Sequence, residues 1–351
     1  MFWLLESRKL RSWLGVIAML PAFLHATRSF SAEESDGPNQ SKPTNNYAAP
    51  TVIVVVGAPG EEDYATKFNQ WASRWEKGSR SAGAKWLPIG YGKEASTNEV
   101  EELKAALEKE PKTGASELWI VLLGHGSFDG KDGKFNLRGP DISATEMAKL
   151  LEPIQRPTAI IAAFSASAPF LTKLSGNGRV VITSTRSGHE QNYSRFGEYI
   201  SEAVADPEAD LDKDGQTSLL EAFLIASRRT SEFYETEGRL ATEHPLLDDN
   251  GDGLGTPPDW FRGVRAVKKA KEGAQLDGLR AHQFYLVRTD AERKLPPEVR
   301  ARRDELELEI GELRASKSSM KEEEYYQKLE AMAVEMAELY EKAAKQKVPG
   351  K

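Results

Sequence analysis

Two apolar runs in the sequence end in side chains that could do chemistry. Residues 158–170 begin as an unbroken apolar run and then change to small side chains, among them Ser165 and Ser167. Residues 117–123 form a second apolar run, which leads into a histidine between two glycines, His125. Such runs suit strands that are covered on both faces of a parallel sheet. Ligands bind beyond the carboxyl ends of these strands, so we expect an imidazole base and a hydroxyl nucleophile there.

A third stretch, residues 210–221, has the spacing of a calcium-binding loop. It reads D-L-D-K-D-G-Q-T-S-L-L-E, with glycine at the sixth place, where the chain bends sharply. Calcium takes oxygen ligands from a flexible wrap of chain, and this spacing supplies them without another element. We therefore predict Ca²⁺ as cofactor; the alternative is an acidic turn exposed to solvent before a helix. The predicted ligand positions are Asp210, Asp212, Asp214, Gln216, Ser218 and Glu221.

A second acidic stretch repeats the first half of this pattern. Here the twelfth place holds Asp259, which is shorter than glutamate, and Pro257 and Pro258 prevent a helix from following at once. Both a second calcium site and a structural Asp/Gly turn remain open. The positions of the second candidate site are Asp248, Asn250, Asp252, Leu254 and Asp259.

The elements that would position these residues alternate between strands and helices. Further strands are expected at 51–56, 85–89 and 179–184, with helical patterns between them. This alternation predicts a doubly wound α/β sheet. Amphipathic helices before and after residues 210–221 predict a helix-loop-helix.

Composition and charge exclude several classes of function. The formal net charge of −7 in 351 residues, without a basic stripe, argues against a nucleic-acid partner. The sequence contains no cysteine, which excludes disulfides, thiolate catalysis and cysteine-ligated metals.

The amino-terminal residues have the pattern of an export signal. Arg8, Lys9 and Arg11 precede an apolar stretch at 13–24 that is too short to span a bilayer. Residues 1–31 are therefore expected to be a signal peptide, and 32–50 a disordered linker. The protein would be periplasmic or secreted; an uncleaved signal anchor is the alternative.

Taken together, the two strand ends and the stretch 183–190 resemble the caspase and legumain group of cysteine endopeptidases. The resemblance covers about residues 52–199 and implies a caspase-like, mainly parallel sheet flanked by helices. It implies that His125 is the base and that the Gly126 amide helps to bind the oxyanion. Ser165 stands where the family has its nucleophilic cysteine, and Ser167 and Ala168 match the serine and glycine after it.

The serine at the nucleophile position changes the expected chemistry. A thiol has a pKa of about 8.5 and is partly ionised at neutral pH. An alcohol reacts only when a base lies within hydrogen-bond reach and is itself oriented by a third group. Asp129 and Asp132 are candidates for that group by proximity in the sequence. We expect a degenerate, inactive site; the alternative is a serine-dependent endopeptidase that uses Ser165 and His125, with Ser167 as another nucleophile position.

The sequence after residue 262 predicts two further segments. Residues 263–295 are expected to be extended, with an edge strand at 283–288, and 296–347 to form a helical hairpin with coiled-coil spacing. That hairpin is a candidate for self-association. The remaining boundaries are 51–205 for the caspase-like domain and 206–262 for the EF-hand-like calcium-binding region. The predicted function is calcium binding outside the cell, with a protein or peptide in the crevice as partner.

Overall fold

The computed structural model describes residues 49–92, 97–272 and 274–346. These residues belong to one compact unit. The predicted signal peptide and most of the predicted linker lie outside the described residues. Among the residues that are described, no helix is both long enough and apolar enough to cross a membrane.

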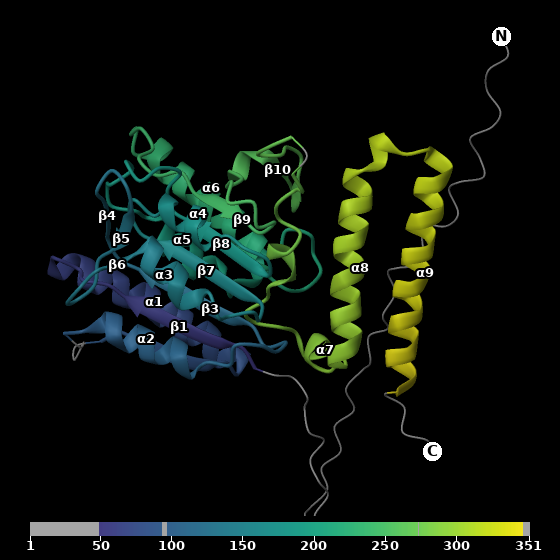
Figure 1. Ribbon diagram of the computed structural model, residues 1–351, viewed down its shortest axis with the longest axis horizontal. Coiled ribbons are helices and arrows are strands. Elements are labelled where there is room, and N and C mark those ends of the chain that lie inside the picture. Colours follow the sequence, from purple (N-terminus) through teal and green to yellow (C-terminus); the bar gives the residue numbers. More distant parts are fainter. Residues whose placement is uncertain (1–48, 93–96, 273, 347–351) are drawn as a thin grey trace, which may run out of the picture. The chain divides into compact units, whose positions relative to one another are not determined.

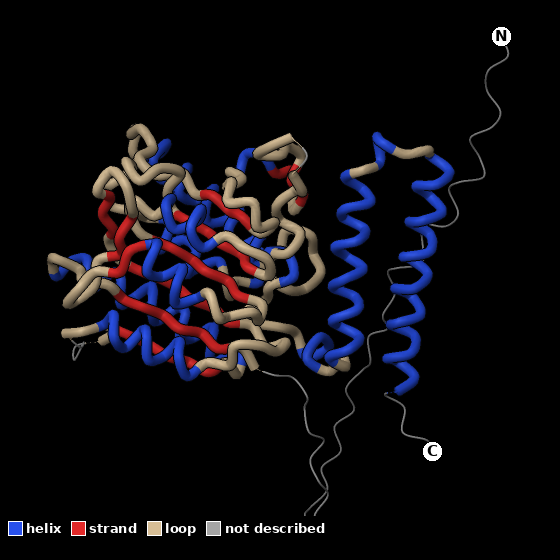
Figure 2. Tube along the Cα trace, viewed as in Figure 1, coloured by secondary structure: helices blue, strands red, loops and turns tan. Residues whose placement is uncertain are grey.

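The unit is built around a six-stranded, mostly parallel sheet (Figures 1 and 2). The first five strands in spatial order are parallel to one another, and the last is antiparallel to its neighbour. Every residue of the three strands β1, β3 and β7 is buried, as expected for apolar runs covered on both faces. The strands in spatial order are β2 (Lys85–Ile89), β1 (Thr51–Val56), β3 (Leu118–Leu123), β7 (Thr158–Ala163), β8 (Arg179–Thr183) and β9 (Leu246–Asp248).

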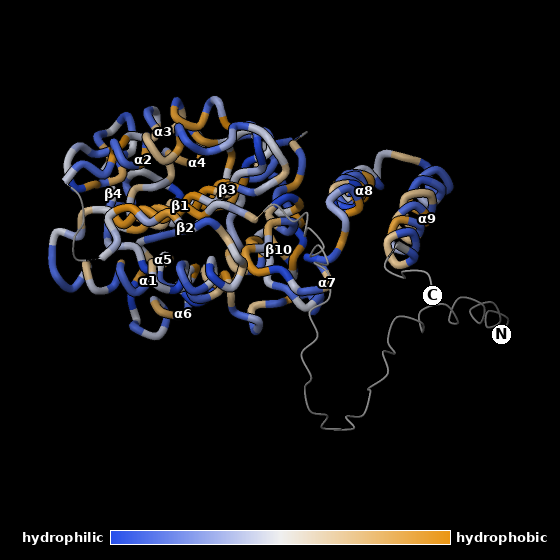
Figure 3. Tube along the Cα trace, turned by 90° about the horizontal axis from the view of Figure 1, so that it is seen from below, coloured by the Kyte–Doolittle hydropathy of each residue, from blue (hydrophilic) through white to orange (hydrophobic). Residues whose placement is uncertain are grey.

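Helices cover both faces of this sheet (Figure 3). One layer contains α1 (Glu62–Ala82), α5 (Phe196–Ala203) and α6 (Leu219–Thr236), and the other contains α2 (Glu99–Lys109), α3 (Ala144–Leu151) and α4 (Ala168–Leu174). Each layer packs its apolar side chains on one face of the strands, which gives two buried clusters. The predicted doubly wound α/β fold class is confirmed.

The helix-loop-helix around the first acidic loop is part of this same core. Helix α5 is followed by the short helix η1 (Pro207–Ala209), the acidic loop and α6. Phe223 of α6 packs against Phe196 of α5, with ring centroids 6.3 Å apart. Both rings are fully buried in the cluster that also contains side chains of the strands. Because protein interiors are close-packed, a shift of α6 would displace side chains of the sheet.

The predicted edge strand at 283–288 is wrong. Residues 281–283 form the short helix η3 (Ala281–Gln283), and the edge of the sheet next to β8 is taken by β9. The reason is packing: Phe284 turns its ring onto Trp119 of β3, with centroids 5.8 Å apart, and its carbonyl accepts a hydrogen bond from the amide of Leu219. The carbonyl of Phe284 therefore bonds to the first residue of α6 instead of to a neighbouring strand.

Smaller elements complete the unit. A three-stranded antiparallel sheet follows His125, made of β4 (Gly126–Phe128), β5 (Gly133–Phe135) and β6 (Ile142–Ser143). The short helix η2 (Pro258–Trp260) precedes a ribbon of β10 (Phe261–Arg262) and β11 (Arg265–Ala266). The carboxyl-terminal region contains α7 (Asp290–Arg293), α8 (Pro297–Ala315), η4 (Lys317–Ser319) and α9 (Glu322–Gln346), of which α8 and α9 pack as the predicted hairpin.

Candidate functional site

His125 and Ser165 lie at one edge of the central sheet because β3 and β7 are parallel neighbours. Leu123 and Ala163, the last residues of these strands, are partners in the register. Each candidate residue follows its strand by two positions. The structure therefore brings the two residues to the same end of the sheet, while their chemical roles stay predictions.

The imidazole of His125 is oriented by a backbone group. Its Nε2 lies 3.2 Å from the carbonyl oxygen of Pro59. A carbonyl only accepts, so Nε2 carries the proton and Nδ1 has the free lone pair. Rings of Tyr64 and Phe68 pack on the imidazole with centroids 4.7 and 5.1 Å away. Burial lowers the pKa of His125, which keeps the ring neutral near pH 7.

The two aspartates expected as partners of His125 have other roles. Asp129 accepts hydrogen bonds from the amides of Lys131 and Asp132, which closes the tip of the β4–β5 hairpin. Asp132 accepts from the amide of Thr145. The orienting group is thus the Pro59 carbonyl, and the proximity argument from the sequence was wrong.

The hydroxyl of Ser165 is bonded to the backbone of Gly126. It donates to the Gly126 carbonyl and accepts from the Gly126 amide, both at 3.2 Å. Its side chain is buried, with 2% of the residue exposed. A Cβ at position 126 would lie 2.3 Å from the carbonyl oxygen of Ser165, so this approach requires glycine. The amide predicted to bind an oxyanion is therefore turned towards the predicted nucleophile.

Ser167 supports the turn that carries Ser165. Its hydroxyl accepts hydrogen bonds from the amides of Ser184 and Thr185, at 3.1 and 3.2 Å, and it is fully buried. These contacts join the end of β7 to the end of β8. Ala166 has a positive φ of 58°, which is uncommon for a residue other than glycine and marks a tight turn.

Glu190 and His244 form a pair beside the same turn. The Glu190 carbonyl accepts from the amide of Ala166 at 2.7 Å, and its carboxylate lies 2.6 Å from His244 Nδ1. His244 also lines a cavity of about 580 Å³ together with Trp260. Sequence reasoning missed His244, because no spacing connects it to the strand ends.

The Asp210 loop brings three carboxylates together. Oxygens of Asp210, Asp212 and Asp214 lie within 4.8 Å of one another. The turn is held by Asp210, which accepts hydrogen bonds from the amides of Lys213 and Gly215 at 2.6 and 3.0 Å. Burial raises the pKa of Asp214, and the neighbouring carboxylates of Asp212 and Glu221 raise it further. This crowding of negative charge, with oxygen donors only, fits a hard cation such as Ca²⁺.

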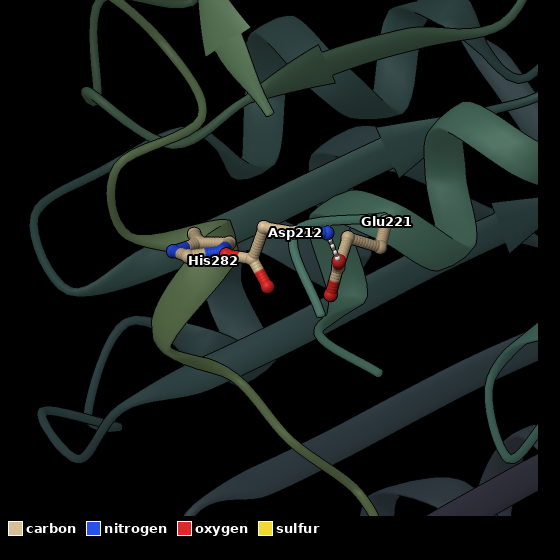
Figure 4. A group of neighbouring side chains, drawn as sticks. All are labelled: Asp212, Glu221 and His282. Atoms are coloured by element: carbon tan, nitrogen blue, oxygen red, sulfur yellow. Dashed lines mark hydrogen bonds and ion pairs between the residues drawn. The ribbon is translucent and has the colours of Figure 1, made fainter. Parts of the chain in front are cut away.

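The carboxylate at the twelfth position, Glu221, is already hydrogen-bonded. One oxygen accepts from the amides of Leu211 and Asp212, and the other from the amide and hydroxyl of Ser218. The last contacts form a capping box at the start of α6. Glu221 also lies with Asp212 and His282 in a group whose ligand atoms are within 4.8 Å of one another (Figure 4). A cation bound to the Glu221 carboxylate would replace some of these hydrogen bonds.

The Asp248 loop has the same turn. Asp248 accepts hydrogen bonds from the amides of Gly251 and Gly253, both at 3.0 Å. Asn250 and Asp252 accept from amides two residues further on, as Asp212 and Asp214 do in the first loop. At the twelfth place, Asp259 lies in η2, is exposed and lines the cavity that contains His244.

A buried carboxyl group closes this second loop from outside. Asp277 accepts hydrogen bonds from the amides of Asp249 and Asn250, at 3.0 and 3.2 Å, and from the hydroxyl of Thr256. Burial raises the pKa of Asp277 to about 8, with a further contribution from the Asp249 carboxylate. Sequence reasoning missed Asp277, which lies beyond the predicted loop.

The comparisons with known proteins concern the fold. No family model matches the chain, and no curated protein matches it. Similar solved structures include the Drosophila initiator caspase Dronc, at 14% identity over 64% of this chain and 92% of that chain, with a TM-score of 0.36. Caspase-1 from Spodoptera frugiperda is similar at 8% identity over 60% of this chain and 91% of that chain, with a TM-score of 0.37. These values carry no argument about residues, so the α/β fold class rests on the sheet described above.

Proposed function

We propose that the chain is an exported calcium-binding protein whose peptidase-type α/β domain binds a protein or peptide without cleaving it. The export part of the proposal rests on residues 1–31, outside the described residues. The calcium part rests on residues 210–221. The binding part, without cleavage, rests on the hydrogen bonds of the Ser165 hydroxyl.

The single observation that carries the calcium proposal is the convergence of Asp210, Asp212 and Asp214. Carboxylates this close repel one another, and a divalent cation between them removes the repulsion. Gln216, at the seventh position, is compatible with the same conclusion. A calcium-binding loop uses only the backbone carbonyl at this position, so the hydrogen bond that the Gln216 side chain accepts does not interfere.

Calorimetric titration with calcium tests this part of the proposal. The wild-type chain should give binding heat, and Asp212→Asn should weaken binding by about tenfold, because ligand charge sets the affinity of such loops. Asp129→Asn is the matched control: it also removes an exposed carboxylate from an Asx turn, and it should leave binding unchanged. The absence of binding heat from the wild-type chain would overturn the calcium proposal.

The contacts of Ser165 support binding without cleavage. A serine nucleophile needs its proton directed at a base and an amide directed at the developing oxyanion. Here the hydroxyl of Ser165 and the amide of Gly126 are bonded to each other. The Ser165 proton is directed at the Gly126 carbonyl and the Gly126 amide at the Ser165 hydroxyl, so neither is directed as a serine hydrolase requires.

The second candidate function is a serine-dependent endopeptidase. It is favoured by the Pro59 carbonyl, which orients the imidazole and leaves Nδ1 of His125 as a base. Incubation with a mixed peptide library separates the two functions. We expect no products from the wild-type chain. Cleavage that disappears in both Ser165→Ala and His125→Ala would establish the second function and remove the first.

A further inference from the structure

The segment at residues 277–293, which we name the strap, runs past both acidic loops and ends at the carboxyl-terminal hairpin. It begins at Asp277, which is bonded to the amides of Asp249 and Asn250 in the second loop. It ends with α7, directly before α8. No sequence pattern marks the strap as functional.

Three contacts join the strap to side chains of the first loop. His282 Nε2 lies 2.9 Å from an oxygen of Asp212 (Figure 4). The hydroxyl of Tyr285 donates to an oxygen of Asp214 at 3.3 Å. The amide of Thr289 donates to the side-chain oxygen of Gln216 at 3.1 Å. The strap thus contacts the residues at the third, fifth and seventh positions of the loop.

The far end of the strap is held by ion pairs that are mostly buried. Arg288 pairs with Glu117, the residue before β3, and lies 3.7 Å from Glu292. Glu292 in turn lies 2.7 Å from Arg303 of α8. Buried pairs of this kind are costly to break, because each partner would be left as an unpaired charge. The strap, β3 and α8 are therefore expected to move together.

We propose that His282 and Tyr285 are positioning residues of the calcium loop, and that through them calcium binding tightens the strap and the attachment of α8. The proposal rests on the calcium binding proposed above. Without a cation, Asp212 and Asp214 repel each other and loosen the loop. A bound cation would take one lone pair of each carboxylate and leave other lone pairs to accept from His282 and Tyr285. The cation and the strap would therefore hold Asp212 and Asp214 in the same position.

This coupling is reciprocal, which gives it a direct test. If calcium stabilises the strap, then loss of the strap's contacts must weaken calcium binding by the same factor. Partners that orient a metal ligand are typically worth tenfold or more in affinity. In calorimetry, Tyr285→Phe and His282→Gln should each weaken calcium binding by about tenfold. Tyr326→Phe and His189→Gln, which change exposed residues away from the loop, are the matched controls.

Hydrogen exchange of the full chain supplies a second measurement that needs no variant. Calcium should slow amide exchange at 282–293 and in α8, and this effect should be lost in the double variant His282→Gln, Tyr285→Phe. Wild-type affinity in both single variants, or exchange in the strap that calcium does not change, would overturn the inference while calcium binding itself stands. A wild-type chain without calcium binding would remove the proposed function and the inference together.

Discussion

The Asp210 loop and the Asp248 loop share a backbone turn and differ in what closes them. In both loops the first aspartate accepts hydrogen bonds from amides three and five residues further on. In the first loop, three carboxylates converge and two of them are exposed. In the second, Asp277 enters from outside and bonds to the loop's own backbone.

The difference indicates how each loop deals with its negative charge. In the second loop the Asp277 carboxyl can hold a proton near pH 7, because its pKa is raised to about 8 by burial and by the neighbouring Asp249 carboxyl. In the first loop Glu221 bonds to the loop's own amides in a similar way. Three more carboxylates converge beside it, so a cation would balance a larger negative charge there. We therefore expect calcium in the Asp210 loop alone, with the Asp248 loop as a structural turn.

The largest expected effect is on calcium affinity. Asp214→Asn should weaken binding by about tenfold or more, because it removes one charged ligand. Asp252→Asn, which makes the same change at the matching place of the second loop, should change the affinity by less than about twofold. Calorimetry of both variants checks this, and equal losses in the two loops would break the distinction between them.

A smaller effect is expected on the pH dependence of stability. In the unfolded chain the Asp277 carboxyl has a pKa of about 4, against about 8 in the folded chain. Between these values the folded chain holds a proton that the unfolded chain releases, so the free energy of unfolding falls as pH rises. Asp277→Asn keeps the carbonyl acceptor and cannot ionise. It should flatten this fall and raise the midpoint of thermal unfolding at pH 9 by about 3–6 °C.

The control for that experiment is the exposed Asp129→Asn. Because hydrogen bonds from backbone amides lower the pKa of Asp129, this variant should change the profile only at acid pH and leave its slope above about pH 5 as in the wild type. A profile for Asp277→Asn that follows the wild type from pH 4 to 9 would show that the buried pair holds no extra proton. The negative charge of the second loop would then have to be balanced in another way, and a bound cation would be the first candidate.

The smallest effect concerns the fourth position of each turn. Lys213 and Gly251 both have positive φ, at 66° and 81°. Gly251→Ala should cost about 1–2 kcal/mol of stability, because a side chain is strained in this conformation. The added Cβ would also lie 3.2 Å from the backbone of Gly176. Urea unfolding measures the loss; a variant as stable as the wild type would show that the second turn is looser than described.

The sequence predicts the fold well wherever apolar runs or local spacing carry the information. The buried strands follow from unbroken apolar runs, and the strand ends at His125 and Ser165 meet because those strands are neighbours. The acidic spacing predicts the turn at Asp210, which the structure shows as hydrogen bonds from nearby amides. Whether that turn holds calcium remains a prediction.

The rest depends on partners that leave no local pattern. The group that orients His125 is a backbone carbonyl, that of Pro59, and any residue could supply one. The contacts of Asp277 and His282 reach loops 28 and 70 residues away. The edge strand was misplaced because β9 has three residues, too few to show a strand period.

The number of calcium ions bound per chain tests the central claim most directly. The account predicts one bound ion for the wild-type chain and for Asp252→Asn, with binding markedly weakened in Asp214→Asn. Two bound ions would contradict the assignment of the Asp248 loop as a structural turn. No bound ion would contradict the proposed function itself.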